Sequence, residues 1–358
     1  MSSRWRGITF WIVAGLACLL SAEVTARVED YLRHDVSLLA VPDHDRDLVL
    51  HDELGIRGRP DGRFKKWQLN GFGFRGSEIA ATPAPGCKRV AVLGASETLG
   101  LYESAGKEYP AQLAVLLRSG GCYEVINAGV AGLNLLGIKV LWENWVSRFG
   151  PDTVVIYPTP AFYLSNNPPT SPGSPSPERP PSLWWPPRLL QRAQDVFEWP
   201  KFVHRRLVLR TLAARQVDTP GWVFENVPED RLRQFQENLG ALIDSISARG
   251  ATPAVMTHAT GFVEAELSQE QDELNAWRQF EPRATARVLL DFEARAAEAV
   301  REIARDKQIA VIDLAATMNG KHAWFADDYL HFSDEGAAMV ARLISQALLP
   351  SGPGGVRK

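Results

Sequence analysis

Cysteine is scarce in this sequence, which holds only three among its 358 residues. A disulfide scaffold needs many more, and no cysteine or histidine cluster has the spacing of a zinc site. An excess of basic residues is also lacking, since 39 Lys and Arg face 42 Asp and Glu. A nucleic-acid binder would carry a strongly basic face. The composition therefore excludes a disulfide scaffold and gives no sign of a metal, another cofactor or a nucleic-acid partner.

Long apolar runs are absent except at the N-terminus. Arg4 and Arg6 precede residues 7–26, which as one helix would span a hydrocarbon core of about 30 Å. Basic residues before the run favour a cytoplasmic N-terminus and an extracytoplasmic, periplasmic main domain. We therefore expect residues 1–26 to anchor the protein in the inner membrane. The alternative is a signal peptide cleaved after the small residues at 24–26, which would give a secreted protein.

The remaining chain divides into segments of different pattern. Residues 27–86 are charged and weakly periodic, and we expect them to be a lead-in packed on the main domain. Residues 87–350 form that domain, and residues 351–358 are expected to be a flexible tail. An insertion at about 164–228 holds nine prolines between positions 168 and 187, followed by a basic amphipathic part. That part is either a helical excursion with a solvated face, or a lid or surface that contacts membrane or glycan.

Short β-branched runs alternate with segments of helical period from Arg89 onward, which is typical of a parallel sheet with crossover helices. The expected strands are Arg89–Leu93, Tyr123–Asn127, Thr153–Tyr157, Thr252–Thr257 and Ile309–Asp313. The expected helices are Tyr109–Arg118, Leu135–Arg148, Glu229–Arg249, Arg283–Asp306 and Asp334–Leu348. This alternation predicts a flavodoxin-like, three-layer, doubly wound α/β domain with a five-stranded parallel sheet, whose ligands bind beyond the carboxyl ends of the strands.

Two loops at that edge carry residues suited to nucleophilic catalysis. Ser96 follows the first strand in a glycine-flanked turn, which can expose a nucleophile and supply backbone N–H groups for an oxyanion. Asp328 precedes His331 by three residues, so its carboxylate can accept the Nδ1 proton. Nε2 is then left to take a proton from the serine hydroxyl. Because both loops lie at one edge of the sheet, the sequence predicts a Ser-His-Asp triad.

These motifs resemble the SGNH, or GDSL-type, hydrolase family over about residues 88–163 and 229–348. Gly94-Ala95-Ser96 resembles its first block, and Asp328 and His331 match its fifth. Residues 125–132 resemble its second block, whose last glycine, here Gly132, donates its N–H to the oxyanion in the family. Residues 70–76 look like the lead-in of membrane-anchored bacterial members. The resemblance implies a serine esterase that acts on an acyl ester without a metal or organic cofactor.

Two positions depart from the family pattern. Ala95 stands where the family has an aspartate that braces the nucleophile loop. Pro160 takes the place of an asparagine that donates to the oxyanion, and proline has no N–H. Losing one oxyanion donor typically costs about 10²–10³ in turnover. The nearby candidates for a replacement donor or a pocket residue are Thr159, Tyr163, Asn134 and Asn166.

Three further residues near the expected site are open to two interpretations. His258 follows the fourth strand at the functional edge and either contacts substrate or is a hydrogen-bonded structural histidine. Trp324 either walls an acyl or sugar pocket or packs beneath a loop. Asp327 is a rival to Asp328 that lacks the Asp-x-x-His spacing.

The sequence therefore predicts an extracytoplasmic serine esterase that removes O-acyl groups, in the simplest case O-acetyl groups of a glycan. Ser96 would be the nucleophile, with backbone N–H groups of Ser96 and Gly132 holding the oxyanion. One alternative is an O-acyltransferase that uses the same residues with a glycan hydroxyl as acceptor. Another is a catalytically impaired module that binds glycan or scaffolds an envelope assembly. The sequence gives no prediction of the oligomeric state.

Cys87 and Cys122 precede the first and second strands, which are neighbours in a flavodoxin-like sheet. Neighbouring strands lie about 4.8 Å apart, which is close enough for a disulfide, and the expected compartment is oxidising. We expect a disulfide at the edge opposite the active site. The alternative is a pair of buried, reduced thiols.

Overall fold

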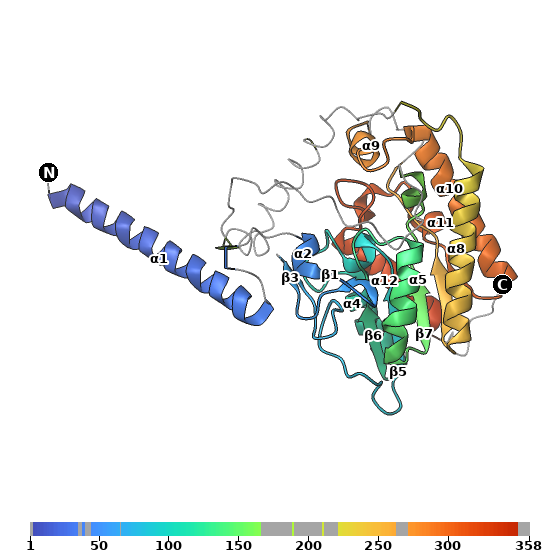
Figure 1. The fold of residues 1–358 in the computed structure, drawn as a ribbon, viewed down its shortest axis with the longest axis horizontal. Helices are drawn as coiled ribbons and strands as arrows, with labels where there is room; N and C mark the ends of the chain where they lie inside the picture. The colour runs from blue at the N-terminus through green and yellow to red at the C-terminus, as the bar shows by residue number, and fades with distance from the viewer. Residues whose placement is uncertain are drawn as a thin grey trace.

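The computed structural model describes residues 3–34, 38–39, 44–64, 66–165, 188–189, 210, 221–262 and 271–349. The predictions for Asn166, for most of the insertion and for the C-terminal tail fall outside these residues. Figure 1 shows one long N-terminal helix, α1 (Ser3–His34), which projects from an α/β domain that holds the labelled helices and strands that follow it.

A five-stranded parallel sheet forms the centre of the domain, in the order β6-β5-β7-β8-β9. Its strands are β5 (Lys88–Leu93), β6 (Tyr123–Asn127), β7 (Thr153–Ile156), β8 (Thr252–Met256) and β9 (Ala310–Ile312). In order along the chain these are strands 2-1-3-4-5 of a flavodoxin-like sheet, so the predicted fold is confirmed. Each strand lies within one residue of its predicted bounds, because β-branched residues buried on both faces mark central parallel strands clearly.

Helices cover both faces of the sheet and make three layers (Figure 1). One face packs against α5 (Leu135–Asn144), α8 (Glu229–Ala248) and α10 (Ala286–Asp306). The other packs against α4 (Tyr109–Leu117) and α12 (Asp334–Leu348). Successive strand residues point to opposite faces, so in β5 Ala91 and Leu93 enter the first core while Val90 and Val92 enter the second.

Several shorter elements connect these strands and helices. They are α3 (Ser96–Leu99), α9 (Gln271–Arg278), α11 (Leu314–Met318) and the 3₁₀ turns η1 (Arg118–Gly120), η2 (Val146–Phe149), η3 (Pro160–Leu164) and η5 (His322–Trp324).

Two helix predictions need correction. α5 ends at Asn144, and the chain continues as η2 up to Gly150, which has a left-handed φ of 58°. α10 begins at Ala286 instead of Arg283, because the Thr285 side chain caps it by accepting the Val288 N–H. Helix α9 was not predicted.

The lead-in is more ordered than its weak periodicity indicated. It contains α2 (His44–Leu48) and two antiparallel pairs, β1 (Val49–Asp52) with β2 (Gly55–Gly58) and β3 (Arg63–Phe64) with β4 (Trp67–Gln68). Strands of two to four residues are too short to show a period. Leu48, Trp67, Leu69 and Phe74 are buried in the larger core, so this part of the lead-in packs on the domain.

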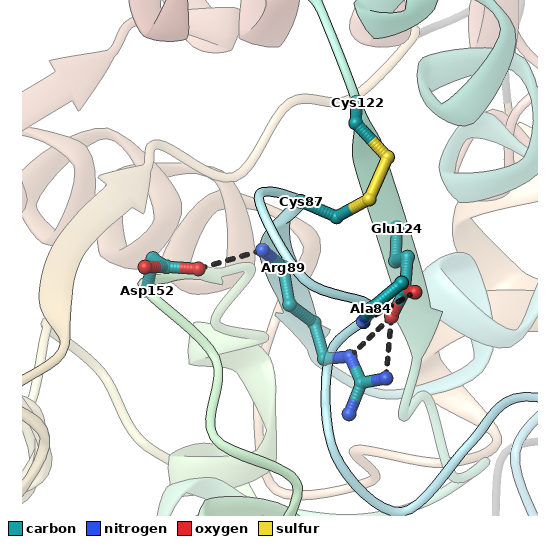
Figure 2. The surroundings of a disulfide bond; sticks show 6 residues. All are labelled: Ala84, Cys87, Arg89, Cys122, Glu124 and Asp152. Atoms are coloured by element: carbon teal, nitrogen blue, oxygen red, sulfur yellow. Dashed lines mark hydrogen bonds and ion pairs between the residues drawn. A yellow bond between two sulfur atoms is a disulfide. The ribbon is translucent and has the colours of Figure 1, made fainter.

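A disulfide joins Cys87 and Cys122 with a Cα separation of 4.5 Å, which confirms that prediction (Figure 2). It closes the amino-terminal edge of β5 and β6, where Lys88 pairs with Tyr123. Arg89 is fully buried beside it, and its Nε donates to the Glu124 carboxylate at 2.8 Å. The edge that carries Ser96 lies at the other end of β5, so this cluster is a structural clamp remote from the candidate site.

Helix α1 is long and apolar enough to cross a membrane, a test that a signal sequence also passes. Its apolar side chains are exposed over most of its length. Near its C-terminal end the Glu23 carboxylate accepts the N–H groups of Arg188 and Leu189 at 2.9 and 3.0 Å. The Arg188 guanidinium lies 3.4 Å from the Asp30 carboxylate. The end of α1 is therefore tied to a segment of the predicted insertion.

Candidate active site

Ser96 is placed by a tight turn between β5 and α3. A side chain at position 94 would put its Cβ 2.0 Å from the Thr98 hydroxyl oxygen, so only glycine fits there. Gly100 has a left-handed φ of 80° and ends α3 after four residues. As the first residue of α3, Ser96 has an N–H with no acceptor within its own helix. The turn therefore presents the hydroxyl and the amide of Ser96 at the carboxyl edge of the sheet.

Asp328 and His331 meet Ser96 at this edge. Asp328 Oδ2 lies 2.6 Å from His331 Nδ1, and Oδ1 accepts the N–H groups of Leu330 and His331 at 3.0 Å each. His331 Nε2 lies 2.9 Å from Ser96 Oγ. Tyr329 takes a left-handed φ of 59°, and its carbonyl accepts the Gly261 N–H at 2.7 Å, which fixes the loop. Asp328, and not Asp327, is the carboxylate that orients the imidazole.

The charges around His331 favour its protonated form. Burial alone would lower the pKa of His331, but the Asp328 carboxylate, with smaller contributions from Glu97 and Glu103, raises it to about 9. Burial would likewise raise the pKa of Asp328, but the facing His331 and the two N–H donors hold it below its usual value. The Tyr102 ring centroid lies 4.8 Å from that of His331 and covers the imidazole.

The loop after β6 lies directly against the turn that carries Ser96. Val130 N donates to Gly94 O at 3.1 Å. A Cβ at Gly129 would lie 2.3 Å from Leu99 N, so this contact of backbone with backbone requires glycine. Gly132 follows with a left-handed φ of 76°. The loop that holds the predicted oxyanion donor Gly132 is thus packed on the helix of Ser96.

The loop after β7 contains the proline that departs from the family pattern. Pro160 is buried and begins η3. The Thr159 hydroxyl is buried and has no hydrogen-bond partner among the described residues. Asn134 instead caps α5, because its side-chain oxygen accepts the Gly137 N–H at 2.9 Å. Of the candidate donors in the described chain, Thr159 is the one whose hydroxyl is buried without a hydrogen-bond partner among the described residues.

Two residues considered for the pocket lie inside the protein. For Tyr163 this corrects the assignment, and for His258 it agrees with the structural interpretation of the two left open. Tyr163 is fully buried, and its hydroxyl accepts a hydrogen bond from Asn238 Nδ2 at 2.8 Å. His258 is 4% exposed, with Nδ1 2.8 Å from Glu293 Oε2. Both positions follow strands at the functional edge, but their side chains turn inward. Trp324 remains partly exposed in η5, with the Lys321 ammonium 4.5 Å from its ring centroid.

Arg75 supports the turn that carries Ser96 from the lead-in, a role that the sequence pattern does not indicate. Its guanidinium donates to the carbonyls of Leu99 and Gly100, the end of α3. It also forms an ion pair of 3.0 Å with Glu108, in which both side chains are 4% exposed. The one feature of the sequence that pointed to Arg75 is its place in the Asn70–Gly76 motif, which resembles the lead-in of membrane-anchored family members.

Three buried glutamates near the site were also missed. Glu97 follows Ser96 and is 4% exposed, and Glu103 is 1% exposed. Burial raises the pKa of Glu103 to about 8 against the opposing charges of Arg75, His331 and Lys66. Glu293, on α10, holds His258. Among the described residues no group of three or more His, Cys, Asp or Glu side chains is arranged to hold a metal ion.

No family model and no curated protein match the sequence. Solved structures do. The lipase/acylhydrolase from Enterococcus faecalis is 16% identical with a TM-score of 0.43, over 72% of this chain and 94% of that one. A catalytic mutant of an acetylxylan esterase from Geobacillus stearothermophilus is 15% identical with a TM-score of 0.43, over 74% and 95%. A lipolytic protein of the G-D-S-L family from Desulfitobacterium hafniense is 14% identical with a TM-score of 0.41, over 73% and 99%. The chain is similar to these proteins, and the roles of its side chains rest on its own geometry.

Proposed function

We propose that this protein is a serine esterase of the SGNH type that hydrolyses O-acyl esters through Ser96, His331 and Asp328. The observation that carries the proposal is the continuous contact from Asp328 Oδ2 to His331 Nδ1, at 2.6 Å, and from His331 Nε2 to Ser96 Oγ, at 2.9 Å. Three side chains from two loops, 235 residues apart in the chain, meet at the sheet edge where doubly wound domains bind ligands.

In the proposed first step, neutral His331 accepts the Ser96 hydroxyl proton at Nε2 while Oγ attacks the acyl carbonyl. Asp328 keeps the Nδ1 proton on the ring and stabilises the imidazolium that forms. His331 then returns its proton to the leaving alcohol oxygen, which leaves an acyl-enzyme on Ser96. A water molecule, activated by the same imidazole, releases the acid and restores the serine.

The oxyanion of the tetrahedral intermediates needs preorganised donors. We assign this role to the backbone N–H groups of Ser96 and Gly132. The Thr159 hydroxyl is our candidate for the donor that Pro160 cannot supply, because a buried hydroxyl without a partner is costly unless it is used.

We further propose that α1 is a retained membrane anchor and that the domain is extracytoplasmic. The small residues that could be cleaved, Val24 to Ala26, lie inside α1, where Ala26 is 3% exposed. The neighbouring Glu23 binds the backbone at 188–189. The Cys87–Cys122 disulfide suits an oxidising compartment. An O-acetylated glycan of the envelope is the substrate class that fits this location.

Hydrolysis of p-nitrophenyl acetate by the full-length protein in detergent tests the proposal, with Ser96→Ala as the comparison. We expect turnover and fluorophosphonate labelling in the wild type and neither in the variant. Labelling with acyl transfer to an added sugar, but without net hydrolysis, would identify an O-acyltransferase instead. A folded wild type that is not labelled would identify a glycan-binding or scaffolding module and reject the esterase.

A further inference from the structure

A second buried carboxylate touches the candidate nucleophile. Glu97 Oε2 lies 3.2 Å from Ser96 Oγ, and the Glu97 side chain is almost fully buried. The Ser96 hydroxyl therefore lies between His331 Nε2 on one side and Glu97 on the other. A hydroxyl has one proton to donate, so Ser96 can donate to only one of these two groups at a time.

A histidine and a third carboxylate hold Glu97 from behind. His258 Nε2 lies 3.7 Å from Glu97 Oε1, and His258 Nδ1 lies 2.8 Å from Glu293 Oε2. The other oxygen of Glu293 accepts the Ala161 N–H at 3.1 Å, next to Pro160. The imidazole also stacks on the Tyr157 ring, with centroids 5.3 Å apart. This relay, Glu97–His258–Glu293, thus joins the nucleophile turn to α10 and to the loop after β7.

The charges in the relay alternate in sign. Burial would lower the pKa of His258, but Glu293 and Glu97 together raise it to about 10. Burial would raise the pKa of Glu97, but His258 and His331 hold it below its ordinary value. A cation is thus held between two carboxylates inside the protein. A buried charge persists only when it is paired, so the relay keeps Glu97 anionic beside the nucleophile.

The protons that Ser96 and His331 can donate favour one arrangement of hydrogen bonds in the resting protein. With Glu97 anionic, every contact is satisfied when Ser96 donates to Glu97 Oε2 and protonated His331 donates Nε2–H to Ser96 Oγ. If His331 is neutral, Ser96 turns its proton to Nε2, and its oxygen then faces the Glu97 carboxylate without a proton between them. Attack on an ester requires this second arrangement.

We propose that Glu97 orients the Ser96 hydroxyl and competes with His331 for its proton, and that His258 and Glu293 are positioning residues that hold Glu97 in place. The proposal rests on the function proposed above. The relay also provides a carboxylate at the nucleophile turn of a chain that has Ala95 where the resembling family has an aspartate. Before catalysis, His331 releases its Nε2 proton to solvent, Ser96 then donates to Nε2, and Oγ attacks the acyl carbonyl as that proton passes to His331.

The groups that face His331 come from three segments. Asp328 lies on its own loop, Glu97 on α3, and Glu103 with Tyr102 on the segment after α3. Lys66 and Arg75 lie beyond Glu103 and oppose its charge. Of the three carboxylates, Glu97 is the one that acts on both Ser96 and His331: it accepts a hydrogen bond from the Ser96 hydroxyl, and its charge raises the pKa of His331. Glu97→Gln is therefore the decisive substitution.

The experiment compares full-length wild type, Glu97→Gln, His258→Gln and the double variant, with Glu237→Gln, an exposed site on α8, as the charge-matched control. Two readouts are followed from about pH 6 to about pH 10. One is the rate of Ser96 labelling by a fluorophosphonate. The other is the ¹⁵N-histidine NMR titration of His331, assigned with His331→Gln. Thermal melting monitors folding.

We expect Glu97→Gln to move both midpoints down by about one pH unit or more, which corresponds to about tenfold faster labelling near neutral pH. His258→Gln should move them in the same direction, and the double variant should add little, because the residues act as a unit. Glu237→Gln should match the wild type. A purely structural role for the relay would lower the labelling plateau without moving a midpoint.

Unchanged midpoints in a labelled, folded Glu97→Gln protein would overturn the relay and leave the esterase standing. If no variant is labelled but Glu97→Gln still moves the His331 titration, the esterase fails and the relay stands. If Glu97→Gln does not fold, His258→Gln alone decides, and an unmoved His331 midpoint in that variant rejects the proposal.

Discussion

The Arg75 guanidinium and the Glu108 carboxylate form an ion pair of 3.0 Å that is almost completely buried. The pair joins the lead-in to the N-cap residue of α4, and the same guanidinium closes the end of α3 at Leu99 and Gly100. The helix that carries Ser96 is too short to be stable by itself. The lead-in therefore supplies part of the rigidity that the nucleophile needs.

Arg75→Ala should strongly destabilise the protein. The substitution leaves Glu108 buried without its partner, a loss of about 3–5 kcal/mol in the free energy of unfolding. Arg287→Ala is the control, because Arg287 and Asp291 form an exposed pair worth about 0–1 kcal/mol. Urea unfolding of both variants measures the difference. Equal stabilities would contradict the structural role of Arg75.

Ser96→Ala and His331→Ala should each abolish ester hydrolysis, and Asp328→Asn should reduce it strongly, with melting temperatures close to that of the wild type. Residues of a triad act as a unit, so Ser96→Ala/His331→Ala should be scarcely worse than either single variant. Initial rates on p-nitrophenyl acetate provide the measurement. More than about a tenth of wild-type activity in Ser96→Ala would reject Ser96 as the nucleophile.

Thr159→Val should lower kcat by about 10²–10³ with little change in KM, because an oxyanion donor acts mainly in the transition state. Thr159→Ser keeps the hydroxyl and should retain most of the activity. Steady-state kinetics of the two variants separate the hydroxyl from the methyl group. If valine is tolerated as well as serine, another group supplies the third donor.

Activity should rise with pH and level off above about pH 9, because His331 must be neutral to accept a proton and its pKa is raised to about 9. The contribution of His331 to the free energy of unfolding changes with pH in the opposite direction. The folded-state pKa lies above the ordinary 6.5, so the paired His331 stabilises the fold fully below about pH 6.5. That contribution is lost as pH rises through about 9. A kcat/KM profile that is flat from pH 6 to pH 10 would contradict this electrostatic account.

Replacing both Cys87 and Cys122 by serine should lower the free energy of unfolding by about 3–4 kcal/mol, from the loop of 35 residues that the bond closes. kcat should not change, because the bond lies at the opposite edge of the sheet from Ser96. Cys18→Ser is the control. Alkylation of unreduced, denatured wild type should modify Cys18 alone, and modification of three thiols would show that no bond forms in the protein.

Much of the fold could be predicted because its signals are local. β-branched runs marked the five strands, and the spacing of Asp328 and His331 identified two members of the candidate site. The predicted parallel sheet then placed Ser96 at the same carboxyl edge as these two residues. The inward turn of Tyr163 was not predictable, because it depends on Asn238, which comes from another helix. For His258 the structural interpretation was open, but its partner Glu293 on α10 has no local signal.

The buried relay has no local signal at all. Glu97, His258 and Glu293 lie far apart in the sequence, and a buried glutamate looks like an exposed one when only the chain is read. The antiparallel strand pairs of the lead-in were not predicted for a different reason: strands of two to four residues are too short to show a period. Arg75 belongs to the Asn70–Gly76 motif, but the sequence gives no sign that Glu108, 33 residues later, is its ion-pair partner.

The unbroken course of α1 has a consequence for how an anchored enzyme would meet its substrate. Thirty-two residues give about 48 Å of helix, of which a hydrocarbon core takes about 30 Å. Residues 3–6 precede the expected span of residues 7–26, so the part of α1 beyond the span is residues 27–34. That part is a stalk of about 12 Å, which Asp30 fixes to Arg188, unlike a flexible tether of variable length. On the proposed topology, Ser96 would travel in a plane at constant height above the bilayer. Turnover would then follow the surface density of esters that reach this plane, and adding one helical turn to the stalk would lift it by about 5.4 Å.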